Sequence, residues 1–280
     1  MVVPSTAARR VAVTGAAGSL AGDILPGLIE QGYEIVGIDR RPSSTFAGAA
    51  WETCSLDDRE RLTAALAGCD AVIHLAGIPL EDDWDSLLAV NIDGTQAVLE
   101  ASRSAGVRRV ILASSIHAAG FVPVPEDGAV VDDDVAIRPN TFYGVSKAAL
   151  EALGRLYHDR WGLEVVCVRI ASRFARPLDE RMLSTWLSPA DAVRLFAAAL
   201  RAPDVGYRVV WGVSANTRGY LSTDGGASIG YVPRDDAEVF AADVLGRATA
   251  WDRRYIGGVF CSPTPPRFEA PIDTQVGAGR

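Results

Sequence analysis

The chain has 280 residues, of which 49% are hydrophobic and 22% charged, the composition of an ordinary globular protein with a sizeable core. Its formal net charge of -8 argues against nucleic acid and anionic membrane surfaces as partners, because like charges repel. No apolar run approaches the roughly 18 residues of a membrane span, and residues 1–10 lack the pattern of a signal peptide, so we expect a cytoplasmic protein.

From Arg10 onward, short apolar runs alternate with longer helical patterns, which is typical of a parallel sheet covered by helices on both faces. The predicted strands are 11–13, 33–38, 51–54, 71–75, 109–113 and 164–168, with two later ones at 209–211 and 228–231. The predicted helices are 20–31, 57–66, 84–104, 140–161 and 189–200. Segment 121–139 contains several prolines and an acidic run at 132–134, so we expect a loop over the carboxyl edge of the sheet with the acidic run in solvent.

These patterns predict an α/β fold with a Rossmann-type, doubly wound parallel sheet in a single domain of residues 1–280. We place the dinucleotide-binding core at about 10–172 and a small C-terminal substrate-binding lobe, with additional sheet strands, at about 173–280.

A glycine-rich turn follows the first predicted strand, with the sequence Thr14-Gly15-Ala16-Ala17-Gly18-Ser19-Leu20-Ala21. Glycines there let backbone N–H groups approach a pyrophosphate, and the next helix adds the positive end of its dipole. A plain turn with a helix cap is the alternative, but the surrounding strands and helix favour dinucleotide binding. The expected contacts on this side are Gly15, Ala17, Gly18, Ser19, Leu20, Asp39 and Arg40.

Asp39 ends the second predicted strand and favours NAD, because its carboxylate accepts hydrogen bonds from ribose hydroxyls and repels a 2'-phosphate. Arg40 and Arg41 follow it and leave NADP open, since arginine can hold that phosphate. We therefore expect NAD as the cofactor.

A candidate catalytic group combines Ser115, at the end of a predicted strand, with Tyr143 and Lys147 on a predicted helix. The interval of four residues places the last two on one helical face. There the Lys147 ammonium would lower the pKa of the Tyr143 phenol, and Ser115 would bind the substrate oxygen that gains or loses a proton. A chance pair on an exposed helix is the alternative, and the preceding motifs favour proton transfer coupled to hydride transfer.

Four cysteines, at positions 54, 69, 167 and 261, lack the spacing of metal ligands, so we expect reduced, structural thiols and no metal site. His74 ends a buried strand and is expected to be structural.

With His74-Leu75-Ala76-Gly77, Asn91 and Arg169-Ile170 added, the motifs resemble the extended branch of the short-chain dehydrogenase/reductase superfamily, which holds sugar epimerases and dehydratases. The resemblance implies the catalytic roles of Ser115, Tyr143 and Lys147, and a homodimer or higher homo-oligomer formed through helices 84–104 and 140–161. Ser55 stands where members of the branch commonly carry an aspartate near the adenine. The further cofactor contacts that the resemblance implies are Leu56, Leu75, Ala76, Gly77, Asn91, Tyr143, Lys147 and Ile170.

Segments 181–188, 210–216 and 257–260 are similar to the uronate dehydrogenases, which extends the resemblance over nearly the whole chain. It implies that Arg181 binds the carboxylate of a sugar acid while NAD oxidises C1 of glucuronate or galacturonate to an aldarolactone. The alternative for Arg181 is a surface ion pair with Asp179 or Glu180. The substrate contacts that the resemblance implies are Pro79, Ser115, Ile116, His117, Tyr143, Ser172 and Arg181.

Two of these positions depart from the uronate dehydrogenase pattern, because Ile116 replaces an asparagine and Pro79 a serine. Both changes remove a hydrogen-bonding side chain, which indicates a changed sugar or a less polar substrate. His117 fits a ligand role and a buried structural role equally well. Two alternative functions are considered. One is another reaction of the extended branch, such as carbonyl reduction or sugar epimerisation, and the other is dinucleotide binding without catalysis.

Overall fold

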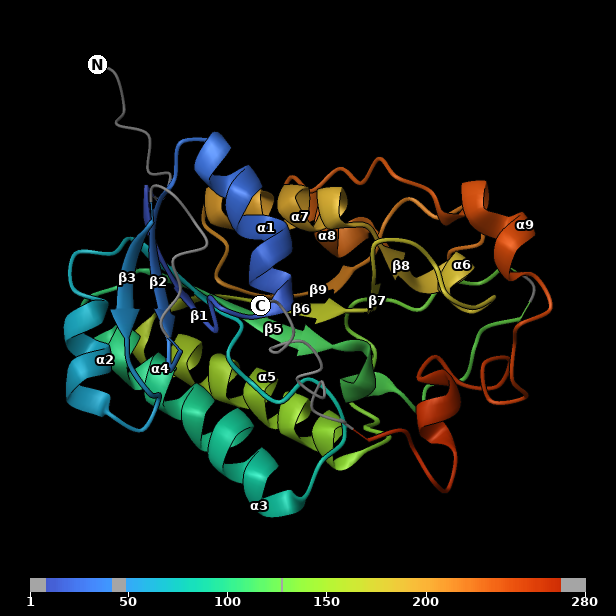
Figure 1. The fold of residues 1–280 in the computed structure, drawn as a ribbon, viewed down its shortest axis with the longest axis horizontal. Coiled ribbons are helices and arrows are strands. Elements are labelled where there is room, and N and C mark those ends of the chain that lie inside the picture. Colours follow the sequence, from blue (N-terminus) through green and yellow to red (C-terminus); the bar gives the residue numbers. More distant parts are fainter. Residues whose placement is uncertain (1–8, 42–48, 127, 268–280) are drawn as a thin grey trace, which may run out of the picture.

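A computed structural model describes residues 9–41, 49–126 and 128–267. Its centre is a seven-stranded, fully parallel sheet in the order β3-β2-β1-β4-β5-β6-β9 (Figure 1). The strands are β1 (Arg10–Thr14), β2 (Glu34–Asp39), β3 (Ala50–Thr53), β4 (Ala71–His74), β5 (Arg109–Ser115), β6 (Glu164–Ile170) and β9 (Tyr207–Gly212). The strand order reverses between β1 and β4, where a doubly wound sheet opens a crevice at its carboxyl end. The predicted fold class is confirmed.

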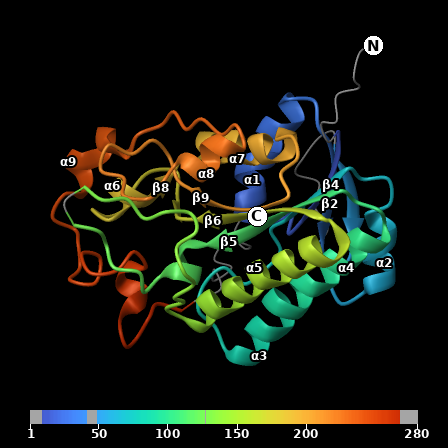
Figure 2. The ribbon, with the colours of Figure 1, turned by 180° about the vertical axis from the view of Figure 1, so that it is seen from behind.

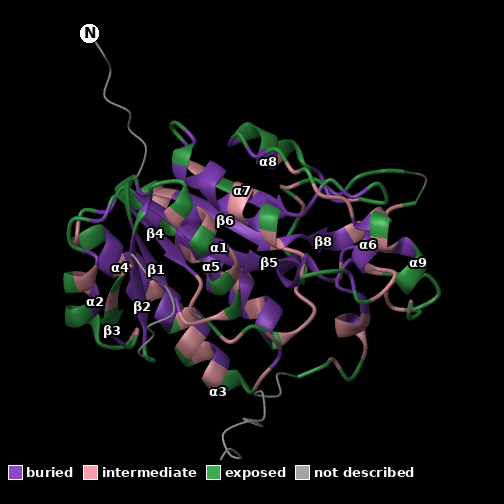
Figure 3. Ribbon diagram, turned by 45° about the horizontal axis from the view of Figure 1, so that its top comes forward, coloured by how far each residue is buried: buried purple, intermediate pink, exposed green. Residues whose placement is uncertain are grey.

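Helices cover both faces of the sheet: α1 (Ser19–Glu30) and α7 (Pro189–Arg201) on one, and α2 (Arg59–Ala65), α4 (Gly94–Ser104) and α5 (Phe142–Trp161) on the other (Figures 1 and 2). Alternation along β1 divides the core accordingly, since Val11 and Val13 pack on the first side and Ala12 on the second. The inner strands of the sheet are consequently buried, while the edge strand β3 and the outer helical faces are largely exposed (Figure 3).

A smaller lobe lies beyond the carboxyl ends of β5 and β6 (Figure 1). It contains a two-stranded sheet of β7 (Ser172–Arg173) and β8 (Trp186–Leu187). Its short helices are α6 (Met182–Thr185), η3 (Ala237–Phe240), α9 (Ala241–Val244) and η4 (Gly258–Cys261). Because β9 comes from the second half of the chain and pairs with β6, a division near residue 172 separates the sequence but not the central sheet.

Two sequence predictions are wrong in this region. Residues 228–231 do not form a strand, because α8 (Asp224–Ser228) ends there in a turn in which Gly230 has φ +81°. The acidic run is not wholly in solvent either. The Asp133 carboxylate accepts hydrogen bonds from the backbone N–H groups of Trp211, at 2.9 Å, and Gly225, at 2.9 Å, and so ties loop 121–139 to β9 and α8.

The predicted helix 84–104 consists of α3 (Trp84–Leu87), a π-helical segment η1 (Leu88–Asp93) and α4. In the part of the chain that the structure describes, no helix has both the length and the apolar character needed to cross a bilayer.

Candidate active site

The turn between β1 and α1 forms the floor of the crevice. Gly15 has φ +71°, and a Cβ atom there would lie 2.6 Å from the backbone nitrogen of Ala76. Gly18 is the N-cap residue of α1 and provides no side-chain cap, and the first turn of α1 contains no acidic residue. The N–H groups of that turn are therefore available to an anion, and only glycine allows the backbone of Ala76 to approach so closely. These features fit the pyrophosphate of a dinucleotide.

Two adjoining cavities, of about 530 and 490 Å³, open above this floor and share Gly15, Gly18, Leu75, Gly77 and Ile78. The first also brings together the predicted residues Asp39, Arg40, Leu56 and Ala76. The second holds most of the other predicted site residues: Ser19, Leu20, Pro79, Ser115, Ile116, His117, Tyr143, Lys147, Ile170, Ser172 and Arg181. Together the cavities have the extent that a dinucleotide and a small substrate require.

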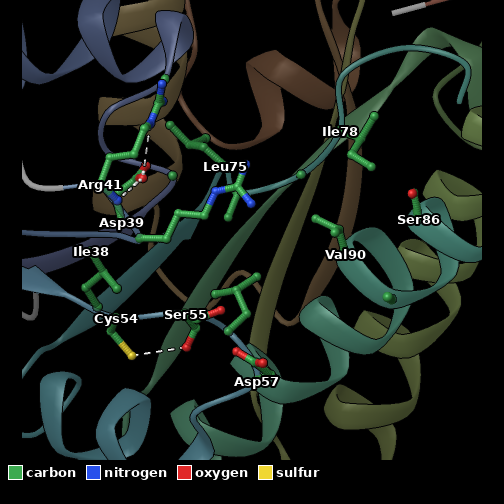
Figure 4. Close-up of a pocket in the computed structure, with 17 residues that line it drawn as sticks. Ile38, Asp39, Arg41, Cys54, Ser55, Asp57, Leu75, Ile78, Ser86 and Val90 are labelled. Carbon is green, nitrogen blue, oxygen red and sulfur yellow. Dashed lines mark hydrogen bonds and ion pairs between the residues drawn. The ribbon is translucent and has the colours of Figure 1, made fainter. Parts of the chain in front are cut away.

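Figure 4 shows the first cavity, in which Asp39 is held by its neighbours. Its carboxylate accepts hydrogen bonds from the N–H groups of Ala17 and Arg41, each at 3.0 Å, and the Nε of Arg41 lies 3.6 Å away. A fixed, buried carboxylate suits the hydroxyls of an adenosine ribose. Ser55, at the position of the expected aspartate, and Asp57 also line this cavity, in the segment that follows β3 next to Asp39.

Ala17 and Asn91, both predicted cofactor contacts, line neither cavity. Ala17 instead fixes Asp39 through its N–H group. Asn91 is buried in η1, where its amide accepts from the N–H of Ile78 at 2.8 Å and donates to the carbonyl of Ile78 at 3.1 Å and to Ser146 at 2.9 Å. Asn91 thus holds the loop after β4 against α5. Its effect on the site is indirect, through the position of that loop.

Ser115, Tyr143 and Lys147 meet in the second cavity, since β5 ends beside the first turn of α5. The side chain of Thr141 caps that helix, and the buried Glu81 carboxylate accepts from the N–H of Tyr143 at 2.8 Å. Glu81 was not predicted, because its contact joins segments 62 residues apart.

The expected lowering of the Tyr143 pKa by Lys147 is wrong for this structure. Burial raises the pKa of Tyr143 to about 12, and it is the Ser115 hydroxyl that acts in the lowering direction. The Lys147 ammonium lies 5.5 Å from the centre of the Tyr143 ring and donates to the carbonyl of Ala113 at 2.8 Å. Burial lowers the pKa of Lys147 to about 8. The lysine can therefore release a proton near neutral pH, as a proton relay requires.

A buried ion pair, which was not predicted, lies near the group formed by Ser115, Tyr143 and Lys147. Arg169 and Glu151 are 3% and 2% exposed and form two hydrogen bonds of 2.9 Å. The Ser114 hydroxyl donates to the same Glu151 carboxylate at 2.6 Å. Through Ser114, the pair fixes the end of β5 and hence Ser115.

Arg181 lines the second cavity and does not form the surface ion pair considered as its alternative. Its Nε and Nη2 donate to the carbonyl of Ile256, the former at 3.0 Å, and its Nη1 donates to Ser172 at 3.3 Å. The turn at Gly258, with φ +59°, leaves room for the arginine, since a Cβ there would lie 2.7 Å from its Cδ. One N–H on each terminal nitrogen is left over after these contacts and can donate to an anion.

His117 both lines the cavity and is braced by the protein. Its Nδ1 lies 3.1 Å from Oδ1 of Asn140, whose Nδ2 donates to Cys261. Nδ1 must therefore carry the hydrogen, which leaves Nε2 as an acceptor. Burial, reinforced by the charge of Arg181, lowers the pKa of His117 to about 3, so the imidazole is neutral.

His74 is structural, as predicted: its ring contacts the hydroxyls of Thr14 at 2.7 Å and Thr95 at 3.1 Å, and burial lowers its pKa to about 3. The four cysteines are free thiols in buried positions. Residues 9–41, 49–126 and 128–267 contain no group of three or more side chains suited to hold a metal ion.

A tyrosine placed for proton transfer beside a dinucleotide-sized crevice is the arrangement used by nicotinamide-dependent oxidoreductases. Fold and site assign the protein to this class.

Comparison with known proteins makes the assignment specific. The model of the NAD dependent epimerase/dehydratase family matches residues 11–200, and the chain belongs to this family. It is similar to the uronate dehydrogenase of Pseudomonas putida, with 38% identity over 93% of this chain and 98% of that protein. Two solved structures are also similar. A mutant uronate dehydrogenase from Agrobacterium tumefaciens complexed with NAD has a TM-score of 0.84 and 35% identity over 93% of this chain and 99% of that one. The glucuronic acid dehydrogenase from Chromohalobacter salexigens has a TM-score of 0.84 and 35% identity over 91% and 97%.

Proposed function

We propose that this protein oxidises C1 of a hexuronic acid, glucuronate or galacturonate, to an aldarolactone with NAD as the hydride acceptor. The observation that carries the proposal is that Arg181 shares one cavity with Ser115, Tyr143 and Lys147. In an acidic protein, a guanidinium at that point gives an anionic sugar a local attraction that the overall charge does not.

Each side chain has a defined task in this reaction. Ser115 donates a hydrogen bond to the C1 oxygen, and the Tyr143 phenolate takes the proton from the C1 hydroxyl. Bound NAD accepts the hydride that leaves C1. Lys147, whose pKa is lowered to about 8, relays the proton away from Tyr143.

Arg181 orients the sugar from its other end. The contacts with Ile256 and Ser172 fix the plane of the guanidinium, so the two remaining terminal N–H groups approach a carboxylate end-on. Nε2 of His117 is available to accept a hydrogen bond from a ring hydroxyl, because the hydrogen is on the other nitrogen.

Two lining residues of the second cavity offer the sugar no polar partner. Pro79 and Ile116 both line the cavity, and neither side chain can form a hydrogen bond. Sites reject a hydroxyl epimer strongly when a polar partner is left unpaired, and an apolar wall removes that penalty. We therefore expect this protein to discriminate weakly between uronic acids that differ at one hydroxyl.

We also propose a homodimer through α4 and α5, which lie side by side on the outside of the molecule (Figure 2). Leu156 and Trp161 support this interface, since both are exposed on α5, at 46% and 43%. The cytoplasm remains the predicted location.

The test is to mix the purified protein with NAD or NADP and a panel of uronic acids, neutral aldoses and simple hydroxy acids, and to follow the absorbance of the reduced nicotinamide. We expect NAD to be reduced with glucuronate or galacturonate, and Arg181→Ala to lose this activity. Arg218→Ala is the control, because Arg218 pairs with Glu238 on the surface. Turnover of neutral aldoses alone, unaffected by Arg181→Ala, would contradict the proposal.

A further inference from the structure

Arg173 joins the C-terminal lobe to the cofactor crevice. It ends β7, lines the second cavity and is largely buried, with its side chain 22% exposed. Its Nη2 donates to the hydroxyl of Ser19 at 2.8 Å, and its Nη1 forms an ion pair with Asp23. Since Ser19 is the first residue of α1, the guanidinium lies beside the turn whose N–H groups face the crevice.

The arginine has donors to spare at this position. A guanidinium carries five N–H groups, and the two contacts described use two of them. The other three can donate to phosphate oxygens while Ser19 and Asp23 keep the side chain in place. An arginine held in this way loses little conformational freedom when it binds.

A negative charge close to the first turn of α1 also favours a cation at this position. The first turn of α1 has no acidic residue, but Asp23 follows it closely and would repel a bound pyrophosphate. Arg173 neutralises that carboxylate and leaves its own remaining donors free. On the adenosine side, Arg41 reaches the same turn through the carbonyl of Ala17, at 3.1 Å. Two arginines thus flank the turn, one from each cavity.

We propose that Arg173 binds the pyrophosphate of the dinucleotide, as a charged contact in addition to the backbone N–H groups of the glycine-rich turn. The inference concerns cofactor binding alone and holds whichever sugar is the substrate.

The test is a calorimetric titration of the purified protein with NAD and, separately, with adenosine, which lacks phosphate. We expect Arg173→Met to weaken NAD binding about tenfold or more, the effect of losing a charged hydrogen-bonding partner, and to leave adenosine binding unchanged. NAD binding by Arg173→Met should also depend less on salt concentration. Arg218→Met is the matched control, because it removes an arginine that pairs with a carboxylate away from both cavities.

A second pair of variants separates direct binding from neutralisation of Asp23. If Arg173 only neutralised this carboxylate, Asp23→Asn would make Arg173→Met harmless. We expect the double variant to bind NAD about tenfold or more weakly than Asp23→Asn alone. Arg173→Gln repeats the test should Arg173→Met fail to fold, since it keeps a donor for Ser19 without the charge. The proposal is overturned if NAD affinity changes by less than about twofold, if adenosine binding falls equally, or if the double variant matches Asp23→Asn.

Discussion

Removal of the Glu151 carboxylate should destabilise the protein severely. In the folded state, Arg169 is 3% exposed and its charge is balanced by Glu151, while its remaining hydrogen bonds are to the carbonyls of Asp133, at 3.3 Å, and Val135, at 3.2 Å. Glu151→Ala therefore leaves a buried guanidinium without a counter-charge. Breaking a buried pair in this way costs about 3–5 kcal/mol of unfolding free energy.

The expected shift of the melting temperature follows from the size of the chain. At roughly 2 °C or more for each kcal/mol in a large domain, Glu151→Ala should melt about 6–10 °C below the unaltered protein. Glu238→Ala is the matched control, because Glu238 pairs with Arg218 on the surface, where their side chains are 38% and 39% exposed. That change should cost less than about 1 kcal/mol.

Urea unfolding followed by tryptophan fluorescence measures both changes, and Trp211 reports on the site because Arg169 lies 5.3 Å from the centre of its ring. A double variant, Glu151→Leu with Arg169→Met, should recover most of the lost stability, since no buried charge remains. The reasoning is refuted if Glu151→Ala costs less than about 1 kcal/mol, or if the double variant is as unstable as the single one.

Three further changes test the site. Gly15→Ala should abolish NAD binding in a titration, whereas Gly32→Ala should not, because Gly32 also has a positive φ of +88° but has open space around it. Gly258→Ala should raise KM for the uronate severalfold by displacing Arg181, with NAD affinity unchanged, and equal losses of both would contradict this. Lys147→Met should lose most activity. At pH 7 this variant should nevertheless melt at a higher temperature than the unaltered protein. The reason is that below about pH 8 the folded unaltered protein must bury a charged ammonium, which the unfolded chain leaves in water. The difference in melting temperature should shrink as pH rises from about 8 towards 10.5, because in this range Lys147 loses its charge in the folded state but keeps it in the unfolded chain. A difference in melting temperature that stays constant over this pH range would refute the prediction.

Local patterns in the sequence were enough to predict the sheet, and most of the predicted site residues line the two cavities. The glycine turn, the Tyr143–Lys147 interval and the strand end at Ser115 depend on neighbours within a few residues, so they can be read without knowledge of the tertiary structure. Long-range contacts explain what was missed. The role of Asp133 depends on β9, 78 residues later, and Arg173 acquires its contact with Ser19 only when β7 lies against α1.

The pKa of Tyr143 shows a different limit. Spacing predicts that Lys147 lies on the same face, and the structure agrees, but the direction of a pKa shift also depends on burial, which spacing does not reveal. The predicted strand at 228–231 is wrong for a related reason, because its apolar residues are buried in a turn and not in a strand. In that turn the Tyr231 hydroxyl donates to the carbonyl of Val213 at 2.9 Å.

The contact between Gly15 and Ala76 has a consequence for how this enzyme can change. At this contact the floor of the cofactor crevice is formed by main-chain atoms of two segments. Its shape there depends on the glycine and not on the side chains of the neighbouring residues. We expect preference between the two nicotinamide dinucleotides to depend on Asp39, Arg40 and Arg41, which line the first cavity. Mutation can therefore alter cofactor choice at these residues, in evolution or in the laboratory, without rebuilding the surface on which either cofactor rests.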